Sequence, residues 1–323
     1  MSDATWGFIG LGHMGYPMAK NLRAKMPASN TLIILDVNSD AMKRFVEESK
    51  AAAKSSGAGA DSMKVETAQN AREVAEKSSV LVTCLPSPEV VKTLYHSVLK
   101  HGKLPPLEQE RLFVDSSTID LPSSRQLADA VHKTLGGRFV DAPMSGGVVG
   151  AHAGTLSFMF GASSQPGGHI ERIKSVLLLM GKKTWHMGEQ GAGVSSKLAN
   201  NYILAINNIA TAEAMNMGVQ WGLDPKLLAD LINSSTGHCW PMAVNNPVPG
   251  VVDGAPASKG YEPGGSVSII NKDLRLAMAG ADASGIALVL AGTAREVYNA
   301  VDDVYRGKDL SVVYQWLQDK PSK

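Results

Sequence analysis

Lys197 and Asn201 have the residue types and the spacing that acid–base chemistry on a small substrate requires. They stand four positions apart in a segment without strand-like alternation, so a helix would place them on one face. The same segment is rich in apolar residues, and a lysine and an asparagine among such neighbours need polar partners or a chemical task. A lysine whose pKa is lowered by burial and a nearby positive charge can act as a general base. A surface lysine on a solvated stripe is the alternative that the spacing leaves open.

A glycine-rich turn near the beginning of the chain lies between a predicted strand, 5–9, and a predicted helix, 14–26. The turn follows the pattern G-x-G-x-x-G and consists of Gly10, Leu11, Gly12, His13, Met14 and Gly15. The first glycine of this pattern allows a tight turn, the second lets a pyrophosphate lie against the backbone, and the third permits close packing of helix on strand. Because helix amino termini bind anions, we expect this turn to bind a dinucleotide. For His13, at a variable position, we expect a structural role close to the cofactor.

Asp36 ends the next predicted strand, 32–35. It follows the glycine turn by about twenty residues, the distance at which a carboxylate can accept hydrogen bonds from an adenosine ribose. A carboxylate there repels a ribose 2′-phosphate, and Val37 and Asn38 supply no guanidinium to bind one. We therefore expect NAD rather than NADP as the cofactor. A helix-capping role for Asp36 is the alternative.

Residues 141–151 are mostly small and follow the last strand that we expect in the sheet, 139–140. Successive backbone N–H groups at Ser145, Gly146 and Gly147 can point into one concavity and bind a carboxylate. The Ser145 hydroxyl adds a further donor. A flexible loop would have the same composition, but ligands of open α/β sheets bind at the carboxyl edge, and this favours a binding site.

The elements that position these residues alternate in type along the first part of the chain. Predicted strands, separated by helical stretches, cover 5–9, 32–35, 79–85, 112–114 and 139–140. Such alternation implies right-handed crossovers and a mainly parallel sheet. After about residue 188 only helical patterns follow, beginning with a long one over 194–222.

The predicted fold is thus an α/β Rossmann-type dinucleotide-binding domain, 1–188, followed by an all-α carboxy-terminal domain, 189–323, joined by a long interdomain helix. Residues 50–66 are rich in Ala, Ser, Gly and Lys without apolar periodicity, so we expect an exposed, mobile insertion there. The apolar content of the long helix exceeds what one small helical domain needs. This excess predicts a homodimer or homotetramer.

Composition excludes several classes of function. Thirty-one basic against thirty acidic residues give a net charge of +1, which argues against a broad nucleic-acid or anionic-membrane surface. The apolar runs are too short to span a bilayer. The two cysteines, Cys84 and Cys239, fit a reducing compartment, and the eight histidines lack metal-ligand spacing, so we expect no metal. With no signal peptide and no Arg-rich leader in the chain, we expect the mitochondrial matrix or the cytoplasm.

Together these motifs resemble the β-hydroxyacid dehydrogenase superfamily over nearly the whole chain. The segments that resemble its cofactor, substrate, catalytic and late cofactor-contacting signatures are 7–15, 141–157, 191–201 and 271–274. Within the superfamily, the stretches that resemble the branch acting on 3-hydroxyisobutyrate are 211–216, 222–228, 237–240 and 246–251. The larger 6-phosphogluconate dehydrogenases carry His-Asn after the lysine, where this chain has Asn200 and Asn201.

The resemblance implies reversible oxidation of 3-hydroxyisobutyrate to methylmalonate semialdehyde, a step of valine breakdown, with NAD as hydride acceptor. It implies that Lys197 is the catalytic acid and base and that the substrate is bound by Ser145, Gly146, Gly147 and Asn201. It further implies that Trp240 packs on the methyl-bearing end of the substrate and that Asp273 holds either Lys197 or Lys272. The residues that it places in the cofactor site, besides the glycine turn, are Leu85, Pro86, Thr118 and Lys272.

Two departures and two alternatives accompany this resemblance. The insertion at 50–66 is longer than the family pattern, and Val90 replaces a frequently polar neighbour of the cofactor. One alternative is a sibling enzyme for another small hydroxyacid or semialdehyde of the tartronate, succinic or glyoxylate type. The other is a catalytically inactive dinucleotide-binding scaffold. The presence of Lys197, Asn201 and Ser145 argues against the scaffold.

Overall fold

The computed structural model describes residues 4–55, 64–164, 169–262 and 264–320. The chain divides into two compact units, Met1–Lys197 and Leu198–Lys323. Each unit has an apolar core of its own, the first including Phe8, Ile34 and Phe158 and the second including Met215 and Tyr298. The predicted boundary at 188/189 coincides with the end of the last strand, whereas the two compact units divide inside the long helix.

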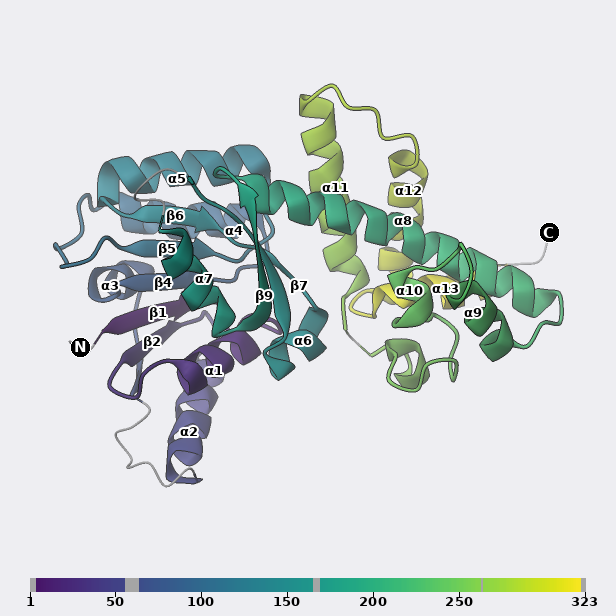
Figure 1. Ribbon diagram of the computed structural model, residues 1–323, viewed down its shortest axis with the longest axis horizontal. Helices are drawn as coiled ribbons and strands as arrows, with labels where there is room; N and C mark the ends of the chain where they lie inside the picture. Colours follow the sequence, from purple (N-terminus) through teal and green to yellow (C-terminus); the bar gives the residue numbers. More distant parts are fainter. Residues whose placement is uncertain (1–3, 56–63, 165–168, 263, 321–323) are drawn as a thin grey trace. The chain divides into compact units, whose positions relative to one another are not determined.

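A parallel sheet organises the first unit, and Figure 1 shows its strands side by side. The strand order is β3-β2-β1-β4-β5-β6, which is the order of doubly wound dinucleotide-binding folds. The bounds are β1 (Thr5–Ile9), β2 (Thr31–Leu35), β3 (Val65–Thr67), β4 (Val80–Thr83), β5 (Leu112–Asp115) and β6 (Arg138–Asp141). The order reverses between β1 and β4, so their carboxyl ends flank the crevice where such folds bind ligands. This arrangement confirms the predicted Rossmann-type fold.

Helices connect the parallel strands and begin at recognisable caps. They are α1 (Gly15–Lys25), α2 (Ser39–Ser55), α3 (Ala71–Lys77), α4 (Pro88–Leu99) and α5 (Leu121–Leu135). The side chains of Asn70, Ser87 and Asp120 each accept a hydrogen bond from a backbone N–H in the first turn of α3, α4 and α5. Such caps satisfy donors that have no partner inside the helix.

A second group of elements extends the sheet beyond β6, and the sequence patterns did not predict its strands. The elements are β7 (Met144–Ser145), α6 (Gly147–Ala153), β8 (Leu156–Gly161), α7 (Ile170–Leu178) and β9 (Gly181–Gly188). Strand β8 runs antiparallel to β6 and β7 and parallel to β9. Because β7 spans two residues and β9 is largely solvent-facing, neither has the apolar signature of a buried strand.

The prediction of an exposed, mobile insertion at 50–66 is wrong at both ends of this range, where the structure has a helix and a strand. Helix α2 continues to Ser55, because Ala and Lys are strong helix formers even where only one side chain of the segment, Ala53, is buried. Strand β3 begins at Val65 and pairs with β2 at the edge of the sheet, so a short run without apolar alternation is held by backbone pairing. Residues 56–63 lie outside the described part of the chain.

The second unit is helical, as predicted. Its elements are the greater part of α8 (Ala192–Gln220), α9 (Pro225–Asn233), α10 (Trp240–Ala243), η1 (Pro256–Lys259), α11 (Val267–Ala283), α12 (Ala291–Tyr305), η2 (Leu310–Val312) and α13 (Val313–Gln318). Inside its core the Tyr298 hydroxyl donates to the Ala205 carbonyl at 2.8 Å and accepts from Asn208 at 3.1 Å. Helix α9 contacts α10, and Figure 1 shows the two helices, both green, side by side.

Among the described helices, none combines the length with the apolar character that crossing a membrane would demand.

Candidate active site

The glycine turn between β1 and α1 leaves open space at one of its three glycines. A Cβ at Gly10, where φ is +100°, would collide with the Cys84 carbonyl, and a Cβ at Gly15 would collide with the Gly10 carbonyl. These two positions therefore need glycine for packing. A Cβ at Gly12 would meet no heavy atom within 4 Å. The space beside Gly12 is where the turn would let a pyrophosphate approach the backbone.

The amino terminus of α1 suits the same negatively charged group. Met14, the residue before α1, provides no side-chain cap, and the first turn contains no acidic residue. The backbone N–H groups at a helix amino terminus carry a partial positive charge, which an anion satisfies. The glycine turn and α1 together thus fit the pyrophosphate of a dinucleotide.

Asp36 is held at the end of β2 by the glycine turn itself. Its Oδ2 accepts a hydrogen bond from the Leu11 N–H at 2.5 Å, and its Oδ1 accepts one from the Asn38 N–H at 2.8 Å. The cap of α2 is supplied by the Asn38 side chain, which accepts from the N–H groups of Asp40 and Ala41. Asp36 is therefore fixed beside the turn, and capping α2 does not require it.

The loops after β4 and β5 are tied together by residues that the sequence analysis missed. The Leu85 N–H donates to Ser117 Oγ at 2.9 Å. Ser117 Oγ and Thr83 Oγ1 both donate to the buried Asp115 carboxylate, at 2.6 and 2.8 Å. This network sets the loops that carry Leu85 with Pro86 and, one residue beyond Ser117, Thr118. An aspartate closing a buried strand ahead of a run of hydroxyl residues is the signal that could have identified it.

The small-residue loop brings Ser145 to the side chain of Lys197. Lys197 Nζ donates to Ser145 Oγ at 3.1 Å. Ser145 ends β7, and Gly146 and Gly147 follow at φ of +131° and +61°, a region that favours glycine. A Cβ at Gly147 would meet no heavy atom within 4 Å, so this side of the loop is open. The first unit therefore brings together the predicted lysine and the predicted carboxylate-binding loop.

A buried carboxylate, Asp141, connects the end of β6 to the beginning of α8. Its two oxygens accept hydrogen bonds from the N–H groups of Gly191 and Val194, both at 2.8 Å. The residue has no solvent-exposed surface, and burial raises its pKa to about 7; the charge of Asp115 acts in the same direction and the two N–H groups oppose it. Asp141 thus fixes the turn of α8 that precedes Lys197.

The second unit brings together Asn201, Asp273 and Lys272. Asn201 Nδ2 donates to Asp273 Oδ2 at 2.5 Å, while Asn201 Oδ1 accepts from Asn200 Nδ2 at 3.0 Å. Lys272 Nζ lies 3.1 Å from Asp273 Oδ1. Of the two lysines expected for Asp273, the structure shows an ion pair with Lys272. Trp240, the first residue of α10, is 51% exposed, so its indole is not buried in the core of its unit.

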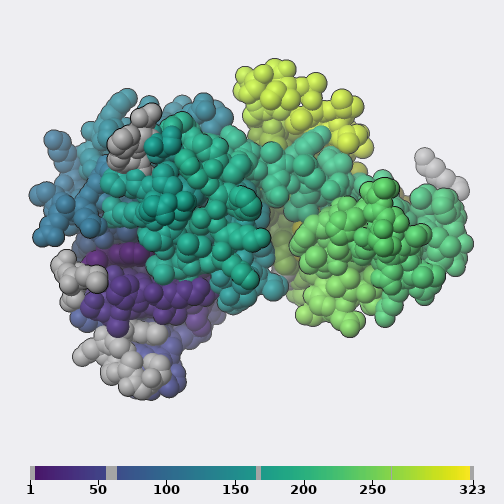
Figure 2. Space-filling model, viewed as in Figure 1, coloured from purple at the N-terminus to yellow at the C-terminus, as the bar shows by residue number. Residues whose placement is uncertain are grey.

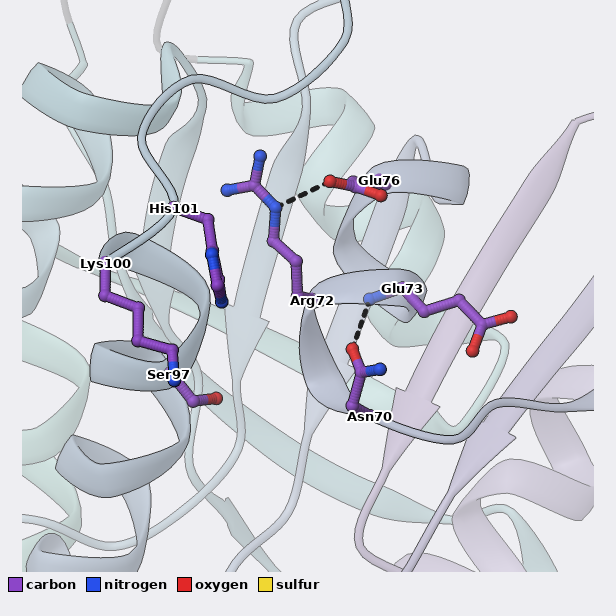
Figure 3. Close-up of a pocket in the computed structure, with 7 residues that line it drawn as sticks. All are labelled: Asn70, Arg72, Glu73, Glu76, Ser97, Lys100 and His101. Atoms are coloured by element: carbon purple, nitrogen blue, oxygen red, sulfur yellow. Dashed lines mark hydrogen bonds and ion pairs between the residues drawn. The ribbon is translucent and has the colours of Figure 1, made fainter.

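A separate hollow of about 530 Å³ lies between α3 and the end of α4, and Figure 3 shows its lining. Arg72 is its central side chain and is fully engaged: it pairs with Glu76 at 2.7 Å and donates to the carbonyls of Val98, Gly102 and Lys103. The arginine therefore ties α3 to the chain after α4. Among the described residues no group of three or more His, Cys, Asp or Glu side chains could hold a metal ion.

The strand order, the open glycine turn and the lysine beside the small-residue loop define the class of protein as a dinucleotide-dependent oxidoreductase with a helical carboxy-terminal unit. Comparison with known families agrees. Residues 5–188 match the profile of the NAD binding domain of 6-phosphogluconate dehydrogenase. Residues 191–317 match the profile described as NAD-binding of NADP-dependent 3-hydroxyisobutyrate dehydrogenase.

Full-length relatives narrow the class. The mitochondrial 3-hydroxyisobutyrate dehydrogenase of Mus musculus is 40% identical over 99% of this chain and 88% of its own length. The Pseudomonas aeruginosa 3-hydroxyisobutyrate dehydrogenase is 36% identical over 97% of this chain and 98% of its own. A Mycobacterium tuberculosis 3-hydroxyisobutyrate dehydrogenase solved with L-serine superposes with a TM-score of 0.83 at 34% identity, covering 98% of this chain and 99% of that one. The chain belongs to the 3-hydroxyisobutyrate dehydrogenase family.

Two glycines of the turn should respond differently to the same substitution. Gly12→Ala places a methyl group in open space, so we expect a normal melting temperature but at least about a tenfold loss of NADH affinity, or about 1.4 kcal/mol. Gly15→Ala forces a methyl group onto the Gly10 carbonyl and should destabilise the protein by about 1–3 kcal/mol. Thermal melting and NADH fluorescence titration measure both. Unchanged NADH affinity in Gly12→Ala would contradict the assignment of the turn.

The titration of Asp141 should be visible in the stability of the protein. Its pKa is about 7 in the folded protein and about 3.9 in an unfolded chain, so between these pH values the folded state binds one more proton. The resulting stabilisation is complete at acid pH and is lost as the pH rises through about 7. Asp141→Asn cannot titrate. We therefore expect the melting temperature of the wild type, relative to Asp141→Asn, to fall between about pH 5 and pH 8; a constant difference would contradict the assigned shift.

Proposed function

We propose that the protein catalyses the reversible NAD-dependent oxidation of 3-hydroxyisobutyrate to methylmalonate semialdehyde, a step of valine breakdown. The observation that carries the proposal is the 3.1 Å hydrogen bond from Lys197 Nζ to Ser145 Oγ, in a unit whose glycine turn is open to a dinucleotide. Membership of the 3-hydroxyisobutyrate dehydrogenase family supports this choice of hydroxyacid.

Lys197 is the proposed acid and base. In oxidation, neutral Lys197 Nζ accepts the proton of the substrate hydroxyl, and in reduction the protonated amine returns it. The hydrogen bond to Ser145 holds the amine beside the loop that receives the substrate. When bound, the dinucleotide supplies the hydride acceptor at its nicotinamide ring.

The other proposed roles concern substrate binding. The backbone N–H groups of Gly146 and Gly147, with the Ser145 hydroxyl, bind the substrate carboxylate. Asn201 contributes its amide, whose orientation is set by the hydrogen bond to Asp273. Trp240, whose side chain is 51% exposed, is the proposed contact of the methyl-bearing end of the substrate.

NAD is the proposed dinucleotide, bound by the glycine turn and by Leu85, Pro86, Thr118 and Lys272. Asp36 lies beside the turn, where its carboxylate accepts ribose hydroxyls and repels a 2′-phosphate. The nearest guanidinium on α2, Arg44, lies over the ring of Tyr16, with Nε 3.3 Å from the Tyr16 hydroxyl, and pairs with Glu48. Arg44 is thus held by contacts with Tyr16 and Glu48.

We also propose a homodimer or homotetramer. Four large apolar side chains in the turn after α8 and on α9 are 48–71% exposed: Trp221, Leu223, Leu227 and Leu231. Figure 2 shows this green part of the chain at the surface. Covering such side chains removes apolar area from water.

The relatives include mitochondrial and bacterial enzymes, and we propose the mitochondrial matrix or the cytoplasm as the compartment.

Initial rates of NAD reduction test the substrate and the dinucleotide. We expect kcat/KM for 3-hydroxyisobutyrate to exceed those for glycerate, 4-hydroxybutyrate and serine by at least about tenfold, the discrimination that one well-fitted apolar group provides. Replacing NAD by NADP should lower kcat/KM by a similar factor. A different substrate ranking would move the protein to a sibling activity, and equal use of NADP would overturn the role of Asp36.

Substitution of the lysine tests the chemistry. Lys197→Ala should lower kcat by about 10²–10⁴-fold, the range typical of a lost acid or base, with little change in NAD affinity. Lys197→Arg keeps the charge but cannot give up its proton, so it should be similarly impaired. Lys174→Ala, which removes a partly exposed lysine paired with Glu171, is the control and should retain normal turnover. Near-normal turnover in Lys197→Ala would rule out the assigned role.

A further inference from the structure

We propose that Asp141 is a positioning residue that sets the location of the Lys197 amine by bracketing the first turn of α8. The inference rests on the proposed function, because it assigns to Asp141 an effect on the proton transfer made by Lys197. Asp141 itself touches neither substrate nor cofactor in this account.

Two paths lead from Asp141 to the same hydrogen bond. Along the chain, Asp141 ends β6 and Ser145 follows four positions later at the end of β7. Through its side chain, Asp141 binds the N–H groups of Gly191 and Val194, and Lys197 lies three positions after Val194 on α8. The contact between Lys197 Nζ and Ser145 Oγ closes this ring. A shift in the first turn of α8 would therefore move the amine relative to the hydroxyl.

The surroundings of Asp141 admit a carboxylate and little else. A Cβ at Gly161 would lie 2.6 Å from Asp141 Oδ1, and a Cβ at Gly193 would lie 2.9 Å from Asp141 Oδ2. These glycines let β8 and α8 approach the two oxygens closely. An asparagine has the same size but would direct an NH₂ group at one of the two backbone donors. A longer glutamate has no room between the glycine backbones.

Electrostatics explain why the two hydrogen bonds to Asp141 hold the first turn of α8 in place. A carboxylate without solvent contact is costly unless charge-assisted hydrogen bonds and a favourable dipole offset the loss of hydration. Both oxygens of Asp141 have such a bond at the positively polarised amino terminus of α8, and these contacts offset part of the burial cost that raises its pKa. Movement of the helix would leave at least one oxygen unpaired in the protein interior, so the first turn has one favoured position.

The test compares Asp141→Asn with the wild type and with Asp224→Asn. Asp224 also caps the first turn of a helix, accepting from the Leu227 N–H at 2.8 Å, but α9 carries no proposed site residue. Assays at about pH 8 keep wild-type Asp141 ionised, because its pKa is about 7. We expect Asp141→Asn to lower kcat for 3-hydroxyisobutyrate by up to about 10²-fold, the effect of roughly a 1 Å misplacement, while NADH affinity stays within about twofold. Asp224→Asn should keep normal kcat.

A double-mutant cycle separates a positioning role from a merely structural one. If Asp141 acts through the lysine, Asp141→Asn should lower the residual turnover of Lys197→Ala by less than about threefold, far less than in the wild type. Equal losses in both backgrounds, or a kcat of Asp141→Asn within twofold of the wild type, would overturn the inference and leave the proposed function intact. A wild type without turnover on any hydroxyacid would overturn both.

A second variant covers the case in which Asp141→Asn does not fold. Val194→Pro removes one of the same two hydrogen bonds from the donor side, and proline is tolerated in the first turn of a helix. NADH binding reports that the first unit is folded. The same loss of kcat with retained NADH affinity is expected, and normal kcat in a folded Val194→Pro would contradict the inference.

Discussion

The interaction on which the proposed site of the first unit depends is that of the buried Asp141 carboxylate with the beginning of α8. Asp141 lies at the end of β6, and each of its oxygens accepts a hydrogen bond from one backbone N–H at the beginning of α8. The parallel sheet fixes one side of this contact, because β6 is paired with β5 along its length. The other side of the contact is the first turn of α8, and the position of this turn sets the position of Lys197. In the proposed account, the distance of 3.1 Å between the Lys197 amine and Ser145 Oγ depends on where β6 ends.

The proposed cofactor site depends on the close approach of the glycine turn to neighbouring backbone. Gly10 and Gly15 are required because β1, α1 and the chain after β4 leave no room for a side chain, whereas Gly12 faces open space. The Leu11 N–H on this turn donates to Asp36, so the glycine turn and the residue proposed to favour NAD over NADP form one hydrogen-bonded unit. In the proposed site, this short segment would therefore both bind the dinucleotide and favour NAD over NADP.

Local patterns predicted the Rossmann strands, the glycine turn and the long helix, because buried strands and amphipathic helices carry periodic apolar signals. They did not predict β7, β8 and β9, whose pairing is tertiary, or β3 at the sheet edge. The hydrogen bond between Lys197 and Ser145 was not predicted; the sequence marked each residue separately as a candidate for the substrate site. The structural roles of Asp141 and Ser117 were not predicted. Both side chains accept hydrogen bonds from backbone N–H groups far away in sequence, those of Val194 and Leu85. A sequence pattern records side chains, whereas these contacts depend on how the backbone folds.

Amide hydrogen exchange over residues 189–197, in the wild type and in Asp141→Asn, tests the central claim that one carboxylate fixes the beginning of α8. The account predicts slow exchange at Gly191 and Val194 in the wild type. In the variant, exchange across 191–197 should be at least about tenfold faster, while β1, β4 and β5 remain as protected as before. Equal protection of 191–197 in the two proteins would show that packing alone holds the helix and would contradict the account.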